Sequence, residues 1–249
     1  MMRFFLKSFI TLLYSSLSLG ANKKGLRALK YHSIRKEQKD DNLWSLDINS
    51  FSDHFSFLVD AKIDLFKIDE LINLIPDRGL VITFDDGFKD NFEIAAPILL
   101  ELGIPFSVFV ITDFISQSKK GYVDELTLKE FSKNPLVTIG SHSCSHPRLT
   151  NLSSSEIKKE VSNSKDYLEG LLGREINAFS YPHGLFNDSI RQEVIEAGYK
   201  LGFTSHYDVN KKTQDKFTLN TNEIWNTDNL TNFQRKINGD WDWLKYRNL

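Results

Sequence analysis

The feature that most constrains this sequence is an apolar run, residues 80–84, that leads directly into Asp85, Asp86 and Gly87. A short run of apolar and β-branched residues followed by glycine is typical of a buried strand that ends in a turn. The two carboxylates are therefore expected at the C-terminal end of a strand, the edge where α/β folds collect reactive side chains. Adjacent carboxylates repel each other unless a cation or a proton separates them, so the pair indicates a metal ligand beside a base.

A second apolar run, residues 136–140, precedes two histidines, His142 and His146. Residues four apart are neighbours on one side of a helical turn, so such a turn in this loop would direct both imidazoles to one point. Two neutral imidazoles and one carboxylate are a ligand set for catalytic zinc, which keeps a further position open. Histidines at this spacing are by themselves more often loop residues, but the acidic pair upstream favours a metal site.

The single cysteine, Cys144, lies between these two histidines. One cysteine excludes an intramolecular disulfide and leaves the redox compartment open. We expect its side chain to point away from the histidines, because alternate positions in a short turn face apart and Asp86 completes the ligand set.

A third segment places His183 between Pro182 and Gly184, after an apolar approach through Ile176 and Ala178. Proline and glycine on either side of one residue predict a tight turn, which would direct a backbone N–H toward the same edge as an oxyanion donor. Taken alone, this is a weak signal.

Strand and helix signals alternate along the rest of the chain. Residues 91–102 and 153–173 have helical patterns, whereas residues 106–111 and 201–204 have strand patterns. Repeated βα units predict a parallel sheet that closes, or nearly closes, into a barrel with the three polar segments at one rim. Since no repeat or linker divides the sequence, we expect one domain over residues 26–249.

In their order along the chain, the three polar segments resemble the motifs of the polysaccharide deacetylases, the NodB-homology or carbohydrate esterase family 4 type. The matching segments are Thr-Phe-Asp-Asp-Gly at 83–87, His-Ser-x-x-His-Pro-x-Leu at 142–149 and aromatic-Pro-x-Gly at 181–184. The resemblance covers roughly residues 26–225, including the Tyr-His-Ser sequence at 31–33. It implies a distorted (β/α) barrel, often with seven strands, and a hydrolase that removes acetyl groups from a carbohydrate.

The resemblance also implies a role for each matching residue. Asp85 would be the general base. Asp86, His142 and His146 would hold a divalent metal, most often zinc. The backbone N–H of His183 would stabilise the oxyanion formed on an N-acetylated glycan.

The sequence departs from the family pattern in two places. Many members have an arginine two residues before the proline of the third motif, where it orients the base, but this chain has Ser180. The Leu-x-x-His motif that supplies a general acid in many members has no clear match. The candidate acids are His32, His183 and His206, each with a purely structural alternative. His32 is preferred because its strand, residues 26–31, should end at the same rim and because histidine titrates near working pH.

Two other functions are alternatives to the deacetylase hypothesis. A glycosidase also uses two carboxylates, but adjacent residues on one strand point apart and would not flank a bond at the required separation of about 5 to 10 Å. A noncatalytic glycan-binding descendant of the same fold is the stronger alternative, because loss of the arginine and of the usual acid is what decay would produce. A site that had lost catalysis would not be expected to retain the base together with all three ligands, so we favour the enzyme.

The composition favours a glycan as partner. A formal net charge of −2 gives no basic footprint for nucleic acid, and a neutral or mixed-charge glycan is expected instead. Trp44 and Trp225 are candidates for stacking on a sugar ring, whereas Trp241 and Trp243 are expected to dock the C-terminal segment.

Residues 1–25 are expected to form an N-terminal helical or targeting segment. Arg3 and Lys7 precede the apolar stretch 9–19, and the small residues before Ala21 resemble a cleavage site. The stretch is shorter than the about 20 apolar residues of a membrane span. We expect either a signal peptide or a helix that packs or lies on a membrane surface. A location at the cell envelope or membrane is favoured, with the cytoplasm as the alternative.

Overall fold

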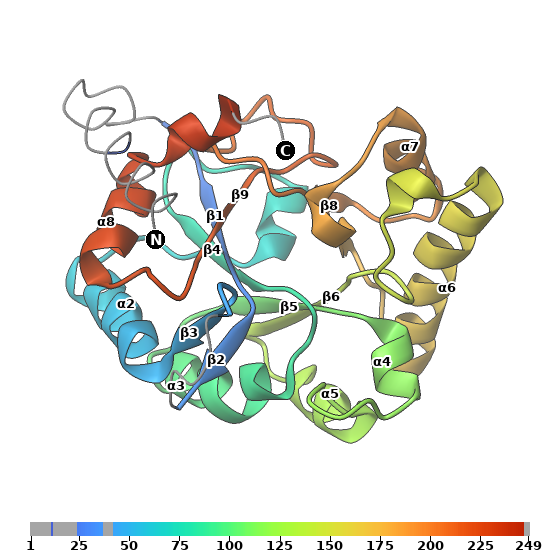
Figure 1. Ribbon diagram of the computed structural model, residues 1–249, viewed down its shortest axis with the longest axis horizontal. Coiled ribbons are helices and arrows are strands. Elements are labelled where there is room, and N and C mark those ends of the chain that lie inside the picture. The colour runs from blue at the N-terminus through green and yellow to red at the C-terminus, as the bar shows by residue number, and fades with distance from the viewer. Residues whose placement is uncertain (1–10, 12–23, 37–41, 247–249) are drawn as a thin grey trace.

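A computed structural model of the chain describes residues 11, 24–36 and 42–246. The strands of its main sheet are β1 Arg27–Tyr31, β4 Leu80–Phe84, β5 Phe106–Val110, β6 Val137–Ser141, β7 Ala178–Ser180, β8 Leu201–Phe203 and β9 Thr221–Glu223. These seven strands pair in the order β8-β7-β6-β5-β4-β1-β9, and every pairing is parallel (Figure 1). A second sheet contains β2 Ser33–Arg35 and β3 Ser45–Asp47.

The two ends of the main sheet approach each other. Phe203 of β8 forms a parallel bridge with Leu219, which precedes β9. The N–H of Thr204 donates to the carbonyl oxygen of Leu219 at 2.8 Å. The sheet is thereby a nearly closed barrel of seven parallel strands, which confirms the predicted fold class.

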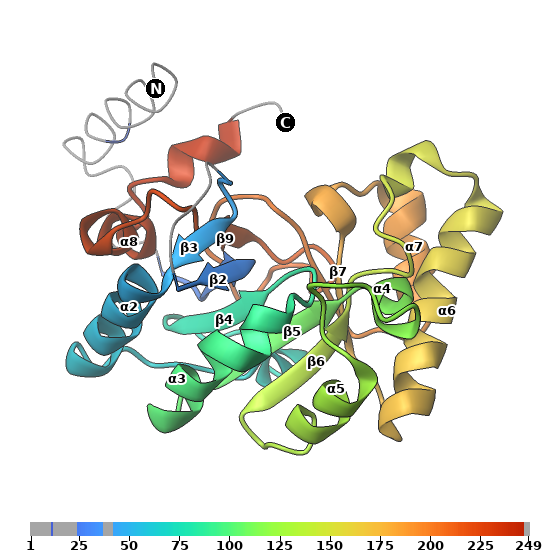
Figure 2. The same cartoon turned by 60° about the horizontal axis from the view of Figure 1, so that its bottom comes forward.

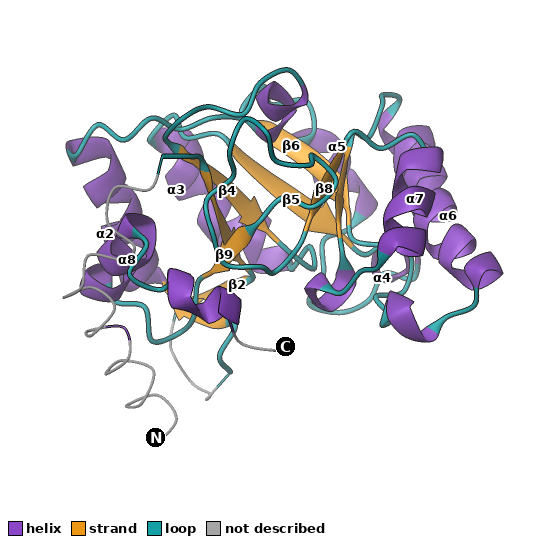
Figure 3. Ribbon diagram, turned by 90° about the horizontal axis from the view of Figure 1, so that it is seen from above, coloured by secondary structure: helices purple, strands orange, loops and turns teal. Residues whose placement is uncertain are grey.

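Helices surround the barrel (Figures 2 and 3). They are α2 Ile48–Asp60, α3 Ala96–Glu101, α4 Thr112–Ser116, α5 Glu125–Phe131, α6 Ser154–Leu172, α7 Asp188–Glu196 and α8 Leu230–Asn238. Shorter 3-10 turns are η1 Ile68–Ile72, η3 Leu149–Asn151, η4 Pro182–Gly184 and η5 Asp242–Tyr246. Helix α6 begins and ends where the sequence predicts, because Ser153 and Glu156 form a capping box and Gly173 ends it with a φ of 65°.

The segment predicted as one helix over residues 91–102 begins with a π-helical turn, η2 Asn91–Ala95. The N–H of Ala96 donates to the carbonyl oxygen of Asn91, five residues earlier. Pro97 has no N–H for the carbonyl four residues before it, which disfavours a regular α-helical turn at this point. Helix α3 then continues to Glu101.

Alternation along each strand decides which side chains face the barrel interior. In β4, Leu80, Ile82 and Phe84 belong to the large apolar cluster between the sheet and the helices. Val81 belongs to the second cluster, together with Ala28, Phe109, Ala178 and Leu201 of the neighbouring strands. Asp85 therefore continues the inward-facing series of Val81 at the point where the strand ends.

Residues 1–25, for which a helical or targeting segment is predicted, lie outside the described residues except for Thr11, Lys24 and Gly25. In the described ranges, no helix has both the length and the apolar character that crossing a bilayer requires.

Candidate metal centre

The inward-facing ends of four strands meet at the mouth of the barrel. Asp85 follows β4, His142 follows β6, Ser180 ends β7, and Lys30 is the last inward-facing residue of β1. A pocket of 540 Å³ opens over this mouth and is lined by Lys30, Asp85 and His142, with Asp86, His146 and His183 from the loops beside them. The structure thus brings all the predicted ligands and the predicted base into one pocket.

Asp86, His142 and His146 direct their ligand atoms at one another. Asp86 Oδ1 lies 3.6 Å from His142 Nε2 and 3.5 Å from His146 Nε2, and the two Nε2 atoms are 3.1 Å apart. Ligands about 2.0–2.2 Å from a tetrahedral zinc ion lie roughly 3.3–3.6 Å from one another. The three separations are close to those of a tetrahedral metal centre.

The hydrogen bonds of the imidazoles suit metal binding. His142 Nδ1 lies 2.7 Å from the carbonyl oxygen of Ser180 and must carry the proton of this contact, which leaves its Nε2 lone pair facing Asp86. Burial, with His142 nearby, lowers the pKa of His146 to about 4, so this imidazole is neutral at neutral pH. Two imidazole nitrogens and a carboxylate oxygen in close contact are a donor set for a cation.

Two of the three proposed ligands have backbone in the left-handed region. Asp86 has a φ of 72°, and in the histidine loop Ser143 and His146 have φ values of 66° and 63°. Such conformations cost about 1–3 kcal/mol for residues other than glycine and cluster at functional sites. The loop has no helical turn between the two histidines, and these left-handed residues bring the imidazoles together instead.

Helix α6 anchors the histidine loop from outside. A carboxylate oxygen of Glu160 accepts hydrogen bonds from the N–H groups of Cys144 and Ser145 at 3.0 Å and 2.9 Å. The thiol of Cys144 points away from the ligands, with Sγ 3.7 Å from the carbonyl oxygen of Lys159. Burial raises the pKa of the Cys144 thiol to about 11, which agrees with an inert residue.

Asp85 is buried, and its two oxygens differ in their contacts. Oδ2 accepts from Ser180 Oγ at 3.0 Å and lies 3.3 Å from Lys30 Nζ and 3.8 Å from His142 Nε2. Oδ1 is buried and has no hydrogen-bond partner among the described residues. Burial by itself raises the pKa of this carboxyl, but Lys30, His142 and His32 lower it to about 2. Asp85 is therefore ionised at neutral pH, and one of its oxygens has no hydrogen-bond partner among the described residues.

Of the three candidate acids, His32 and His183 line the pocket, whereas His206 is exposed and lies outside the set of lining residues. The His32 ring packs 4.9 Å from that of Trp44, and its Nδ1 is buried with no partner in the described part of the chain. Burial lowers the pKa of His32, although Asp86 acts in the opposite direction. His183 has a φ of 59°, and its ring centroid lies 4.6 Å from that of His146.

The tryptophans divide differently from the expectation. Trp44 lines the pocket and is 38% exposed, as a sugar platform requires. Trp225 also lines the pocket but is 4% exposed and packs edge-on against Trp241. Trp243 donates from Nε1 to Thr11 Oγ1 at 2.9 Å, so it links the described C-terminal turn to Thr11.

Sequence reasoning missed several pocket residues, notably Lys30, Ser205, Tyr207 and Glu223. A signal existed for Lys30, because it is a charge between Leu29 and Tyr31 within the expected strand, residues 26–31. A charge in such a strand needs a partner, since a lone buried charge is costly.

Comparisons with known proteins agree with the geometry of the site. Residues 75–202 match the family model described as polysaccharide deacetylase. YxkH of Bacillus subtilis, whose name places it among the polysaccharide deacetylases, is 26% identical over 200 residues, which cover 78% of this chain and 69% of that protein. The poly-β-1,6-N-acetyl-D-glucosamine N-deacetylase of Staphylococcus aureus is 25% identical over 205 residues, 71% of each protein.

Two solved structures share the fold. The Streptococcus pyogenes deacetylase PplD in complex with acetate superposes with a TM-score of 0.79 at 24% identity, over 86% of this chain and 98% of that one. IcaB from Ammonifex degensii gives a TM-score of 0.76 at 19% identity, over 88% and 97% of the two chains. At these identities the superpositions show a common fold.

Proposed function

The chain belongs to the polysaccharide deacetylase family, and we propose that it is a metal-dependent hydrolase that releases acetate from an N-acetylated glycan. One observation carries the proposal: the Asp86, His142 and His146 cluster lies beside the ionised carboxylate of Asp85, which has one oxygen without a partner. A ligand set and a base are the two protein components that hydrolysis of an amide by activated water requires.

The charges of the pocket fit a divalent cation. The carboxylates of Asp85, Asp86 and Glu223 face the same pocket as the buried ammonium of Lys30, while Arg148 lies exposed at its edge. Negative charge therefore exceeds positive charge in the deep part of the pocket. Zinc held by Asp86 and the two histidines would supply Lewis acidity, which polarises the acetyl carbonyl and acidifies water.

The protein's own groups supply the proton transfers and the contact to the oxyanion. Asp85 Oδ1 accepts the proton of the attacking water, because Oδ2 is already engaged by Ser180 and Lys30. The turn after β7 presents the N–H of His183 to the oxyanion. His32, which lines the same pocket with Trp44 packed against its ring, gives a proton to the leaving amine.

Acetate release from a panel of N-acetylated and O-acetylated oligosaccharides tests the function. The polymer named for the staphylococcal relatives, poly-β-1,6-N-acetyl-D-glucosamine, is the first substrate to try. We expect release with zinc, loss after chelation and recovery when zinc is returned. A protein that binds these glycans yet releases no acetate with any divalent metal would instead be the noncatalytic alternative.

The acid role of His32 is tested by the leaving group. An amine needs a proton to leave, whereas 4-nitrophenolate does not, so His32→Gln should lower kcat/KM about 10²-fold for the N-acetyl substrate and much less for 4-nitrophenyl acetate. His206→Gln is the matched control, because His206 is exposed outside the pocket and should affect neither substrate. Equal losses on both substrates for His32→Gln would remove His32 as the acid.

Two predictions from the sequence stay proposals. We propose that residues 26–249 act as one catalytic domain and that the protein works at the cell envelope or at a membrane surface.

A further inference from the structure

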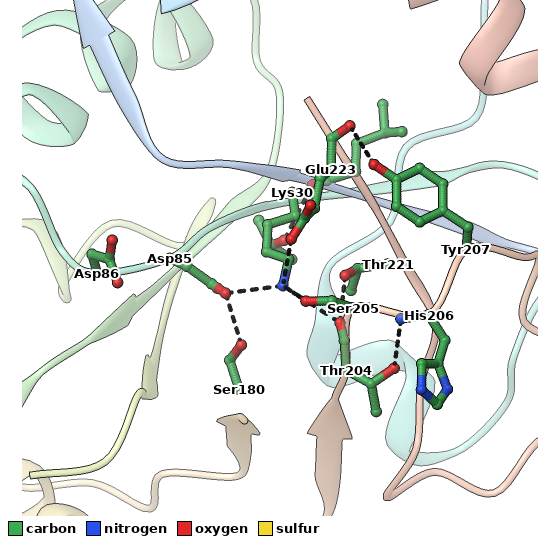
Figure 4. A network of polar contacts seen from close by, with 12 residues as sticks. Lys30, Asp85, Asp86, Ser180, Thr204, Ser205, His206, Tyr207, Thr221 and Glu223 are labelled. Atoms are coloured by element: carbon green, nitrogen blue, oxygen red, sulfur yellow. Dashed lines mark hydrogen bonds and ion pairs between the residues drawn. The ribbon is translucent and has the colours of Figure 1, made fainter. Parts of the chain in front are cut away.

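We propose that Lys30 is a positioning residue, which holds the base Asp85 by one oxygen so that the carboxylate keeps one orientation and its other oxygen stays available to take a proton. The inference rests on the proposed function, because it assigns the base a fixed orientation. Figure 4 shows the network, in which the ammonium of Lys30 lies between Asp85 on one side and Ser205 and Glu223 on the other.

The pairing of β1 with β4 brings Lys30 to Asp85. Lys30 lies opposite Thr83 in the parallel register, and the N–H of Asp85 donates to the carbonyl oxygen of Tyr31 at 3.0 Å. The two strands thus stay paired up to the base itself. Ala28 faces the barrel interior, and Lys30, two residues further, takes the same side.

The ammonium of Lys30 is fixed by partners from other strands. It donates to Ser205 Oγ at 2.7 Å, and its distances to the carbonyl oxygen of Thr204 and to Glu223 Oε1 are 3.5 Å and 3.9 Å. The residue is 2% exposed. A buried ammonium with several fixed partners can occupy only one position, so it is a rigid support for a neighbouring carboxylate.

The asymmetry at Asp85 follows from this support. Both Ser180 Oγ and Lys30 Nζ contact Oδ2, while Oδ1 has no partner in the described residues. A carboxylate held by one hydroxyl can turn about its Cβ–Cγ bond, but a second contact from another strand fixes it. The chain has Ser180 where the family pattern places arginine, and the cation reaches the base from β1 instead.

Lys30→Met tests the proposal, because methionine fills the volume and removes the charge. We expect kcat to fall about 10²-fold, the loss that misplacing a catalytic group can produce, while KM changes little. Zinc affinity, measured by titration, should stay close to that of the wild type because Lys30 contacts none of the proposed ligands. Lys165→Met is the matched control, since Lys165 is another largely buried lysine, paired with Glu169 on α6, and should leave kcat unchanged.

Chemical rescue separates a positioning charge from a purely structural role. Lys30→Ala lacks the atoms of n-propylammonium, and Lys30 lines the pocket, so the added ion can reach the space. We expect n-propylammonium to restore the rate of Lys30→Ala at least about tenfold with saturation, whereas the neutral n-propanol should not. A folded Lys30→Met with wild-type kcat, or equal effects of the ion and the alcohol, would overturn the proposal.

Crystal structures give a readout that does not need turnover. In Lys30→Met, the Asp85 carboxylate should be rotated or present in two orientations, and in the wild type it should have one. If the wild type releases no acetate, the proposed function fails, and these structures still decide the role of Lys30. An unchanged Asp85 carboxylate in Lys30→Met would count against it.

Discussion

Asp85→Asn is expected to lower the rate of acetate release about 10³-fold while the protein still binds zinc. The amide has the shape of the carboxylate but accepts a proton far less readily, so the base is lost with little change in packing. Asp85 is outside the cluster that can hold the metal. Loss of turnover with retained metal would therefore separate the base from the ligands.

The measurement combines steady-state acetate release with zinc stoichiometry on the same sample. Asp166→Asn is a matched control, because it makes the same change on an exposed residue of α6 and should leave both quantities unchanged. Wild-type turnover in Asp85→Asn would show that another group takes the proton. Loss of zinc together with turnover would place Asp85 among the ligands.

The sequence predicts the central residues of the site because strand ends are local features. The apolar run 80–84 ends in Asp85, and 136–140 ends just before His142, so both are read from a few neighbouring residues. Parallel strands then place these ends at one rim, whatever the exact register. The nearly closed barrel and the convergence of the two segments follow from this argument.

Other parts of the site depend on which strands are neighbours. Lys30 meets Asp85 because β1 lies beside β4, and it approaches Glu223 because β9 lies on its other side. No local pattern in the sequence encodes this order of strands. The left-handed backbone of His146 also could not be predicted from the sequence, because its conformation depends on a loop held by Glu160 of α6.

Ser180 has a different meaning in the structure from the one that the sequence suggests. Without an arginine at this position, the base could be taken as unsupported, as in a decayed site. Ser180 instead donates to Asp85 Oδ2, and its carbonyl oxygen accepts from His142 Nδ1. One residue thus contacts both the proposed base and a proposed ligand, which favours the enzyme over the noncatalytic alternative.

His142→Ala is expected to abolish both zinc binding and turnover. The variant removes a donor that lies 3.6 Å from Asp86 Oδ1 and 3.1 Å from His146 Nε2. Loss of a group that only supports a ligand costs 10–100-fold in metal affinity, so loss of a ligand itself should cost more than about 100-fold. Zinc titration and acetate release on the same protein measure the two effects.

His54→Ala controls for general damage in the His142 experiment. His54 is fully buried and bonded to the carbonyl oxygen of Asp228 at 2.8 Å, and burial lowers its pKa to about 4. Its loss should lower the melting temperature yet keep zinc at wild-type stoichiometry. If His142→Ala also kept its zinc while folded, Asp86 and His146 would not depend on His142, and the metal centre would have to be rebuilt from other donors.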